Sequence, residues 1–314
     1  MKILVLLGCV AVLLVAVEAW LKIGYGFGNP PLYVGDEHIG YMLAPNQRLK
    51  RFGNLIAINE YGMRADEIAS RPNDNTLRLF LLGDSLANGN WWTDQSEILS
   101  VQIAQNLQPS LPKSYRYIEP INASANSWGP RNELAYLQRY GTFGAQVLVL
   151  LINTDDLFGT APTPIQVGRD RAYPNRKPWS AIAEVLAKVK KDPPIPELKA
   201  IQDEGGDRVG KNISAINGIY KQVTAAGSTF VLILSPLKRE LPGPRDYELT
   251  ARQRLKDWAS ESNATYLDLI ETYRAYKPDP EQLYRDHIHL SPEGHKLVAR
   301  EAAKAIATTF SDQL

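Results

Sequence analysis

The chain has 314 residues, of which 44% are hydrophobic and 22% charged, and this composition is typical of a globular protein. Its 35 basic and 34 acidic residues leave a net charge of +1, and it has no long basic block, which argues against a nucleic-acid-binding protein. The one cysteine, Cys9, excludes internal disulfide bonds and a cysteine-based metal site in the rest of the chain.

Residues 1–22 are predicted to form a membrane anchor or a signal segment. Lys2 precedes an unbroken apolar run at 3–17, and the three apolar residues after Glu18 bring the run close to the length of a span, about 20 residues. Three alternatives stay open: an uncleaved anchor, a cleaved signal peptide and a lipoprotein signal at Leu-Leu-Gly-Cys9. All three place the remaining chain outside the cytoplasm. A buried structural helix is disfavoured, because the run has no amphipathic period.

Residues 23–76 are rich in glycine and proline and are predicted to form an irregular or β-rich lead-in that packs on the main domain. From residue 77 to residue 314 the pattern changes to alternating strands and helices. The leucine-rich and β-branched strands predict a parallel sheet covered by helices on both faces. Strands are predicted at 77–82, 116–122, 146–152, 229–234 and 265–269, and helices at 96–107, 131–140, 212–226, 246–260 and 292–308.

One segment, 157–211, interrupts this alternation. It holds more than fifty residues without a predicted strand, which is too long for a plain connection in a compact domain. We therefore predict a functional insertion or lid, with a mobile surface excursion as the alternative.

The first predicted strand ends abruptly in Gly83-Asp84-Ser85. Gly83 allows a sharp turn that a residue with a Cβ would resist. Ser85 then emerges past the carboxyl end of a buried parallel strand, which is where open α/β sheets bind their ligands. A serine in that place is either a helix N-cap or a nucleophile.

The far end of the chain supplies partners for this serine. Asp286 and His289 stand three residues apart in the loop before the last predicted helix, whose N-cap is Ser291. A histidine can take the proton of a serine near neutral pH, and a carboxylate can orient that histidine. His287 and His289 alternate and could share a metal ion, but no second group of ligands accompanies them. His295 is predicted to lie on the helix surface.

At these residues the sequence resembles the SGNH/GDSL hydrolase superfamily, over about residue 77 to the C-terminus. The stretch "GDSLANG" is similar to the first family block and places Ser85 at the nucleophile, while "DHIHLSPEGH" is similar to the last block and places Asp286 and His289 at the other two catalytic positions. The resemblance implies a three-layer α/β/α sandwich with a flavodoxin-like parallel sheet, preceded here by an N-terminal hydrophobic helix.

The resemblance also implies an oxyanion hole. The backbone N–H groups of Ser85 and Ser127 fall on two of its donors, and Ser127 of "INASANSWG" replaces the usual glycine. Asp155 stands where the family has an asparagine, and an ionised carboxylate cannot donate a hydrogen bond. Either burial keeps Asp155 protonated, or Asn153 or another donor substitutes for it, or turnover is slow.

The sequence thus predicts an extracytoplasmic, membrane-anchored serine esterase or acylhydrolase that cleaves acyl or acetyl esters. Ser85 is its nucleophile, His289 its base and then its acid, and Asp286 orients the histidine. The alternatives are an O-acyltransferase acting on envelope polysaccharide and a catalytically weak polysaccharide-binding module, which only Asp155 favours. We expect a small-molecule or polysaccharide ester as substrate, with no cofactor, no metal and no nucleic acid. The acyl group, the acceptor and the oligomeric state stay open.

Overall fold

The computed structural model describes residues 1–311, so the last three residues of the predicted hydrolase domain lie outside the described part. Five parallel strands form its central sheet, in the order β6-β5-β7-β8-β9. The apolar runs of the three central strands β5, β7 and β8 are buried, and all seven residues of β7 are buried. The strands are β5 (Thr76–Gly83), β6 (Tyr117–Ser124), β7 (Val147–Asn153), β8 (Thr229–Ser235) and β9 (Thr265–Asp268).

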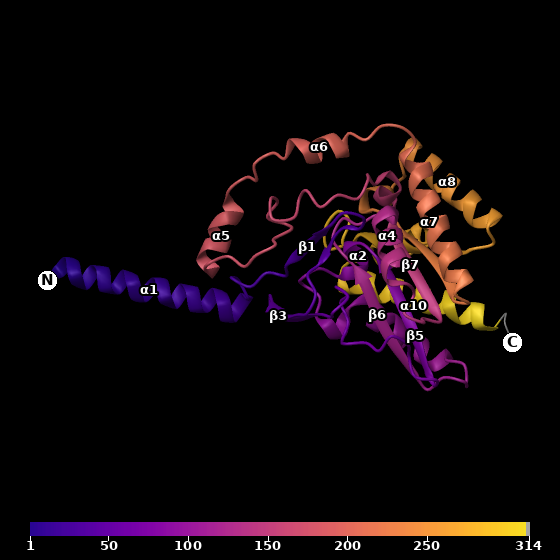
Figure 1. The fold of residues 1–314 in the computed structure, drawn as a ribbon, viewed down its shortest axis with the longest axis horizontal. Coiled ribbons are helices and arrows are strands. Elements are labelled where there is room, and N and C mark those ends of the chain that lie inside the picture. Colours follow the sequence, from indigo (N-terminus) through magenta and orange to yellow (C-terminus); the bar gives the residue numbers. More distant parts are fainter. Residues whose placement is uncertain (312–314) are drawn as a thin grey trace.

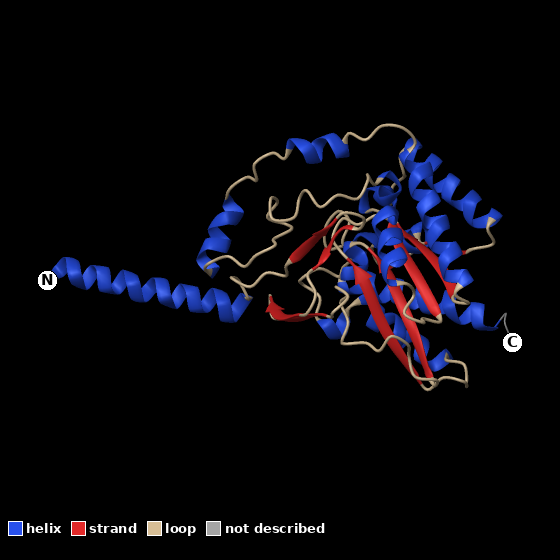
Figure 2. Ribbon diagram, viewed as in Figure 1, coloured by secondary structure: helices blue, strands red, loops and turns tan. Residues whose placement is uncertain are grey.

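Helices cover both faces of this sheet (Figures 1 and 2). Apolar side chains on the two faces form two separate buried clusters, so that each strand is apolar on both sides. The predicted three-layer α/β/α sandwich is confirmed. One layer contains α4 (Pro130–Tyr140), α7 (Arg208–Ala225) and α8 (Asp246–Glu261), and the other contains α3 (Leu99–Leu107), α9 (Ile270–Arg274) and α10 (Pro292–Ser311).

The strand order creates a switch point beside β5. The chain leaves β5 for β6 on one side and then returns to β7 on the other side. In an open parallel sheet, the carboxyl ends of such a pair of strands border a crevice that binds ligands. Gly83, at the end of β5, lies here, but it does not adopt a positive φ as a turn glycine would. A Cβ at Gly83 would lie 2.5 Å from the carbonyl oxygen of Leu151, so close packing, rather than conformational freedom, requires the glycine.

The lead-in folds into two antiparallel hairpins. One consists of β1 (Tyr33–Asp36) and β2 (Gly40–Leu43), and the other of β3 (Gln47–Arg51) and β4 (Asn54–Ile58). Their buried side chains join the apolar cluster on the α4 face of the sheet.

Residues 159–207, all of which the structure describes, contain two helices and no strand. These helices are α5 (Ala181–Val189) and α6 (Pro196–Gln202), and they arch from the side of the domain toward α7 (Figure 1). Helix α7 begins at Arg208, earlier than predicted, because the Asp207 side chain caps it by accepting from the Gly210 N–H. The remaining short helices are α2 (Ser85–Asn88) and the 3₁₀ turns η1 (Gln95–Glu97), η2 (Gln108–Ser110), η3 (Thr154–Phe158), η4 (Lys238–Glu240) and η5 (Pro280–Leu283).

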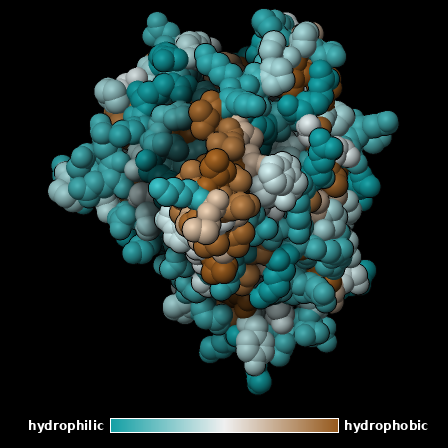
Figure 3. Space-filling model, turned by 90° about the vertical axis from the view of Figure 1, so that its left-hand side faces the viewer, coloured by the Kyte–Doolittle hydropathy of each residue, from teal (hydrophilic) through white to brown (hydrophobic). Residues whose placement is uncertain are grey.

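Helix α1 (Lys2–Tyr25) projects from the domain as a single rod (Figure 1). By length and composition it can cross a membrane, and its most apolar stretch is not buried against the rest of the protein. Viewed end-on, its apolar side chains form a brown column among mainly hydrophilic neighbours (Figure 3). The helix ends at Gly26, whose φ of 74° is the left-handed conformation typical of a glycine stop.

Candidate active site

Ser85 begins the four-residue helix α2, directly past the end of β5. The N-cap of this helix is Asp84, whose Oδ1 accepts from the Leu86 N–H at 2.8 Å, so Ser85 does not cap the helix. The Ser85 side chain lines a pocket, and the residue as a whole is only 7% exposed. The hydroxyl is therefore held at a strand-to-helix turn without the capping role that would explain a serine there.

His289 and Asp286 lie beside this serine, 204 residues later in the chain. The distance from His289 Nε2 to Ser85 Oγ is 3.1 Å, and that from His289 Nδ1 to Asp286 Oδ2 is 2.7 Å. A tautomer that donates Nδ1–H to the carboxylate leaves Nε2 to accept from the serine O–H. The three residues that the sequence singled out form one continuous hydrogen-bonded chain, suited to removing the serine proton.

Asp286 is fixed by its own loop. Its Oδ1 accepts from the backbone N–H groups of Ile288 (2.9 Å) and His289 (2.8 Å). Burial alone would raise the pKa of Asp286, but these hydrogen bonds and the His289 side chain outweigh it and lower that pKa to about 2. The carboxylate therefore stays ionised at neutral pH, as a partner for a histidinium must.

Two rings lie near His289, and the second of them, His295, corrects a sequence prediction. Trp92 meets the His289 ring edge-on at 5.3 Å between centroids, and the Arg285 guanidinium lies 4.6 Å from the centre of the Trp92 ring. Trp92 thus packs behind the histidine. His295, predicted on the surface, is buried in the first turn of α10. Burial, followed by the positive charges of Arg64 and His289, lowers the pKa of His295 to about 4, so it is neutral at pH 7.

Sequence reasoning missed Arg64, which lies in the lead-in and is fully buried. Its guanidinium donates to the carbonyl oxygens of Asn88 (2.7 Å), Asn90 (2.8 Å) and Thr93 (3.0 Å). These carbonyls lie at the end of α2 and in the loop after it, so Arg64 fixes the C-terminal side of the helix that begins with Ser85. No local pattern in the sequence marks this role, because the three partners lie 24 to 29 residues away.

Asp155 does not occupy the buried place that the sequence predicted for it. Its side chain is 54% exposed, and its carboxylate accepts from Arg239 Nη2 at 2.6 Å. The ion pair with Asp155 raises the pKa of Arg239. The hypothesis that burial keeps Asp155 protonated, so that it can donate to an oxyanion, is therefore wrong because Asp155 is not buried.

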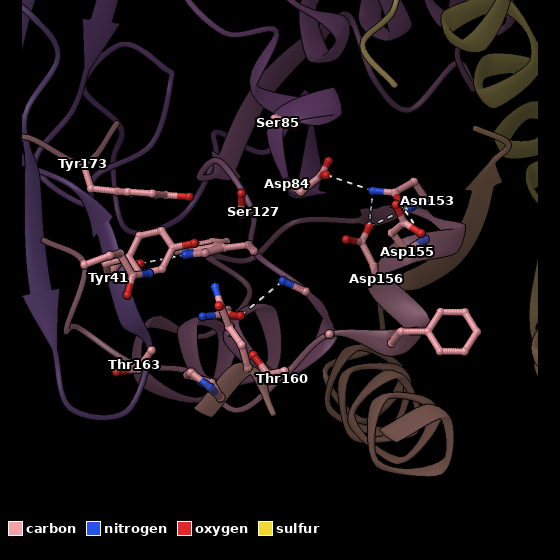
Figure 4. A pocket seen from close by; sticks show the side chains of 18 of the residues that line it. Tyr41, Asp84, Ser85, Ser127, Asn153, Asp155, Asp156, Thr160, Thr163 and Tyr173 are labelled. Carbon is pink, nitrogen blue, oxygen red and sulfur yellow. Dashed lines mark hydrogen bonds between the residues drawn. The ribbon is translucent and has the colours of Figure 1, made fainter. Parts of the chain in front are cut away.

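Asn153 is buried at the end of β7 and is already fully engaged. Its side-chain Nδ2 donates to Asp84 Oδ2 at 3.0 Å and to Asp156 Oδ2 at 2.7 Å, as the dashed lines of Figure 4 show. Its Oδ1 accepts from the Asp155 N–H at 2.8 Å. An amide has two N–H donors, and both are used. This geometry contradicts the hypothesis that Asn153 replaces the missing oxyanion donor.

A group of buried carboxyls, Asp84, Asp156 and Glu133, lies beneath the serine turn. Burial raises the pKa of Asp84 to about 6, although the Leu86 N–H, His289 and Asn153 act against it. Burial, followed by the charge of Asp84, raises the pKa values of Asp156 and Glu133 well above their usual range. Neither carboxyl oxygen of Glu133 has a hydrogen-bond partner among residues 1–311.

Replacement of Glu133 by glutamine is expected to change how stability depends on pH. The folded state holds the Glu133 proton above the pH at which the unfolded chain releases it, because the folded pKa is raised. Wild-type stability should therefore fall as pH rises from about 4.5, by about 1.4 kcal/mol per pH unit for this group until its folded pKa is reached. Glu133→Gln removes that loss, so its Tm should gain on the wild type as the pH rises above about 4.5.

Thermal unfolding across this range measures the difference, and Glu261→Gln, on the exposed end of α8, is the matched control. Parallel Tm–pH curves for the wild type and Glu133→Gln would contradict the raised pKa of Glu133.

Ser127 lies on the pocket wall with a φ of 60°, the left-handed conformation that favours glycine. A serine in this conformation matches the sequence alignment, which places Ser127 at a glycine position. Its side chain projects toward the pocket, near Tyr173 (Figure 4).

The pocket in front of Ser85 has a volume of about 580 Å³. The lead-in contributes Tyr41, and the segment after β7 contributes a large part of the wall, so both additions to the sheet shape the site (Figure 4). Among residues 1–311, no three His, Cys, Asp or Glu side chains are grouped as metal ligands. The wall residues from segment 159–207 are Gly159, Thr160, Ala161, Pro162, Thr163, Gln166, Asp170, Tyr173, Leu198 and Gln202.

A family model, that of the GDSL-like lipase/acylhydrolase family, matches residues 81–297, which is more than half of the chain. The chain belongs to the GDSL-like lipase/acylhydrolase family. This GDSL-type protein is therefore a serine ester hydrolase, and the predicted resemblance is confirmed. The match begins within β5 and ends in α10, so it includes both the serine turn and the Asp286–His289 loop.

Solved structures of the same type are similar at low sequence identity. The acetyl xylan esterase AlAXEase is 13% identical, with 73% of this chain and 100% of that chain covered and a TM-score of 0.48. An acetylxylan esterase from Geobacillus stearothermophilus, solved as a catalytic mutant, is 14% identical, with 73% and 94% covered and a TM-score of 0.46. The psychrotrophic esterase EstA from Pseudoalteromonas sp. is 15% identical, with 76% and 100% covered and a TM-score of 0.44. No curated protein sequence matches the GDSL-type chain.

Proposed function

We propose that this GDSL-type hydrolase cleaves carboxylic esters through Ser85, His289 and Asp286. The observation that carries the proposal is the hydrogen-bonded chain from Ser85 Oγ through His289 to Asp286, with distances of 3.1 and 2.7 Å. Ser85 Oγ attacks the ester carbonyl carbon while His289 Nε2 takes the hydroxyl proton. His289 then gives that proton to the departing alcohol, which leaves an acyl-enzyme. Water, deprotonated by the same imidazole, releases the acid and restores the serine.

The backbone N–H groups of Ser85 and Ser127 are the proposed oxyanion donors. Ser85 begins α2, where N–H groups have no partner within the helix, and Ser127 faces the same pocket in a glycine-like conformation. Asp155 is not included among the donors, because its carboxylate is paired with Arg239. Asn153 is not included, because both of its amide hydrogens are used.

The proposed substrate is a short acyl group, such as acetyl, on a polar or carbohydrate scaffold. The pocket wall combines aromatic rings, which can pack on a sugar face, with amide and carboxylate side chains, which can bind hydroxyls. A long acyl chain would need a continuous apolar channel, and polar groups line this wall on several sides. The rings belong to Tyr41, Trp128, Phe158 and Tyr173, and the polar groups to Asn132, Gln166, Asp170 and Gln202.

We also propose that the enzyme is held outside the cytoplasm by α1 as an uncleaved anchor. The helix is apolar, exposed and long enough to span a bilayer, and its charge at Glu18 lies near the end that joins the domain.

Incubation of the full-length protein with a fluorophosphonate probe tests the chemistry. We expect one covalent adduct on Ser85, because only an activated serine reacts with such a probe, and hydrolysis of aryl acetate faster than of aryl esters with long acyl chains. Adding a sugar acceptor during turnover separates hydrolysis from acyl transfer, since an acylated sugar would identify a transferase. The absence of any adduct would contradict the proposed chemistry.

A further inference from the structure

The end of the domain next to α1 carries an exposed apolar surface. Two helices contribute to it, α1 through its last two turns and α5 with the tryptophan that precedes it. Several of these side chains are almost fully exposed, Trp179 and Ile23 at 88% and Val189 at 83%. We call this surface the α1/α5 surface, and it consists of Trp20, Ile23, Trp179, Leu186 and Val189.

Helix α5 is hydrogen-bonded directly to α1. The first backbone N–H groups of α5, at Ala181 and Ile182, donate to the two carboxylate oxygens of Glu18 at 2.8 and 3.0 Å. Such N–H groups have no partner within their own helix, so Glu18 acts as the cap of α5 from another element. Lys22 pairs with the same carboxylate at 2.9 Å. The charged residue that interrupts the apolar run of α1 thus has a structural partner 163 residues away.

The polar face of α5, which carries Glu184 and Lys188, is also held against the chain that follows α1. Glu184 accepts from the Gly28 N–H at 2.6 Å and pairs with Arg51. The Lys188 ammonium lies 4.8 Å from the centre of the Phe27 ring. With its polar face tied to the chain that follows α1, the helix presents its exposed apolar side chains outward, and no part of residues 1–311 covers them.

The length of α1 determines how deep this surface must lie if α1 crosses a membrane. The helix has 16 residues before Glu18, Lys2–Val17, which at about 1.5 Å per residue span about 24 Å. The hydrocarbon core of a bilayer is about 30 Å thick. The run is about 6 Å shorter than this core, so Glu18 lies within about 6 Å of the hydrocarbon boundary if α1 crosses the bilayer. Its ion pair and two N–H donors satisfy the carboxylate at that depth, and α5, which supplies the donors, lies at the same level.

The positive charges around α5 complement the negative charges of an anionic lipid surface. Arg176 and Lys177 precede Trp179, and Lys190 and Lys191 follow just beyond the end of the helix. Basic side chains near anionic headgroups contribute about 1 kcal/mol each, and tryptophan is enriched at this depth. The acidic residues nearby are already paired, Glu184 with Arg51 and Asp192 with Arg171.

We propose that α5 lies in the headgroup region of the leaflet from which α1 emerges, with anionic bilayer lipid as the partner of the α1/α5 surface. This inference rests on the proposed membrane anchoring by α1. It has a consequence for the active site, because α5 lies between two pocket-lining stretches of one segment, which include Tyr173 before it and Leu198 after it. Contact with the membrane would then hold this wall of the pocket in place, in addition to the hydrogen bonds from Glu18 of α1.

Depth-dependent fluorescence quenching of the full-length protein tests the proposal. In a Cys9→Ser background, Val189→Cys and Leu186→Cys each accept one environment-sensitive fluorophore, and Tyr117→Cys, exposed at the start of β6, is the matched control. The proteins are reconstituted into vesicles of phosphatidylcholine and phosphatidylglycerol that contain a nitroxide-labelled lipid. We expect a headgroup nitroxide to quench the labels on α5 several-fold more strongly than the label at 117. Removing phosphatidylglycerol should weaken that quenching.

Quenching on α5 no stronger than at position 117 would overturn the proposal. A fluorophore at Val12→Cys, in the middle of α1, distinguishes this failure from failure of the anchor. Deep quenching at position 12 without quenching on α5 rejects only the lipid contact of α5. No deep quenching at position 12 rejects the anchoring and, with it, the premise of this inference. Unchanged hydrolysis of an aryl acetate by the labelled proteins shows that they are folded.

Discussion

Ser85→Ala is expected to lower kcat for hydrolysis of an aryl acetate by a factor on the order of 10⁴–10⁶, with little change in Tm. The loss is large because the hydroxyl forms the covalent bond, and a serine hydrolase without its nucleophile keeps only the contribution of its oxyanion hole and binding site. Stability should change little, because Asp84, and not Ser85, caps α2. The variant should also lose the fluorophosphonate adduct.

Ser127→Ala is the matched control for this variant. Ser127 lines the same pocket, but its proposed role uses the backbone N–H, which the substitution keeps. We expect its kcat to stay within about tenfold of the wild type. Steady-state kinetics and mass spectrometry of the labelled proteins check both expectations. Labelling of Ser85→Ala at the wild-type rate would show that another residue is the nucleophile.

The sequence was sufficient to predict the fold and the three residues of the hydrogen-bonded chain, for related reasons. Parallel strands buried on both faces need continuous apolar runs, so the strands near 79 and 149 could be recognised from composition alone. Ser85, Asp286 and His289 occur in short local patterns, each at the end of a strand or the start of a helix. The topology of an open sheet then brings such ends together.

Other parts of the site depend on contacts between distant residues, which a single sequence does not reveal. Asp155 was expected to be buried because it follows an apolar strand, yet Arg239, 84 residues later, holds it at the surface. Asn153 looked like a free donor, but one of its two acceptors comes from the loop after β5. The link between Glu18 and α5 is of the same kind, since a lone charge in an apolar run gives no indication of its partner.

Asn153→Asp is expected to have the largest effect on stability. The Asn153 side chain joins the end of β7 to the turn after β5 by donating hydrogen bonds, and a carboxylate can only accept them. The amide Nδ2 now donates to Asp84 and to Asp156 within a fully buried group of carboxyls. An aspartate of the same shape cannot donate when ionised, and it adds another titratable carboxyl to this buried group. Loss of a buried, charge-assisted partner typically costs about 3–5 kcal/mol.

The same substitution should lower the esterase activity. Asp84 is the N-cap of α2, so displacement of its carboxylate moves the turn that begins with Ser85. Acidic pH should partly restore the stability of Asn153→Asp, because protonation removes the added charge and supplies an O–H donor. The pH dependence works in this direction because burial and like charges raise carboxyl pKa values in the folded state, so that protons favour folding.

Asp155→Asn is the matched control. It makes the reverse exchange, of a carboxylate oxygen for an amide nitrogen, at a nearby exposed position. It removes only the ion pair with Arg239, and exposed pairs of this kind contribute about 0–1 kcal/mol. Chemical denaturation at pH 5 and pH 8, with kcat measured for both proteins, separates the two effects. If Asn153→Asp is as stable as Asp155→Asn at pH 8, Asn153 does not clamp the serine turn to β7. If instead it is unstable at pH 8 but at pH 5 regains stability, together with activity relative to the wild type at the same pH, the amide between Asp84 and Asp156 is what holds the nucleophile in place.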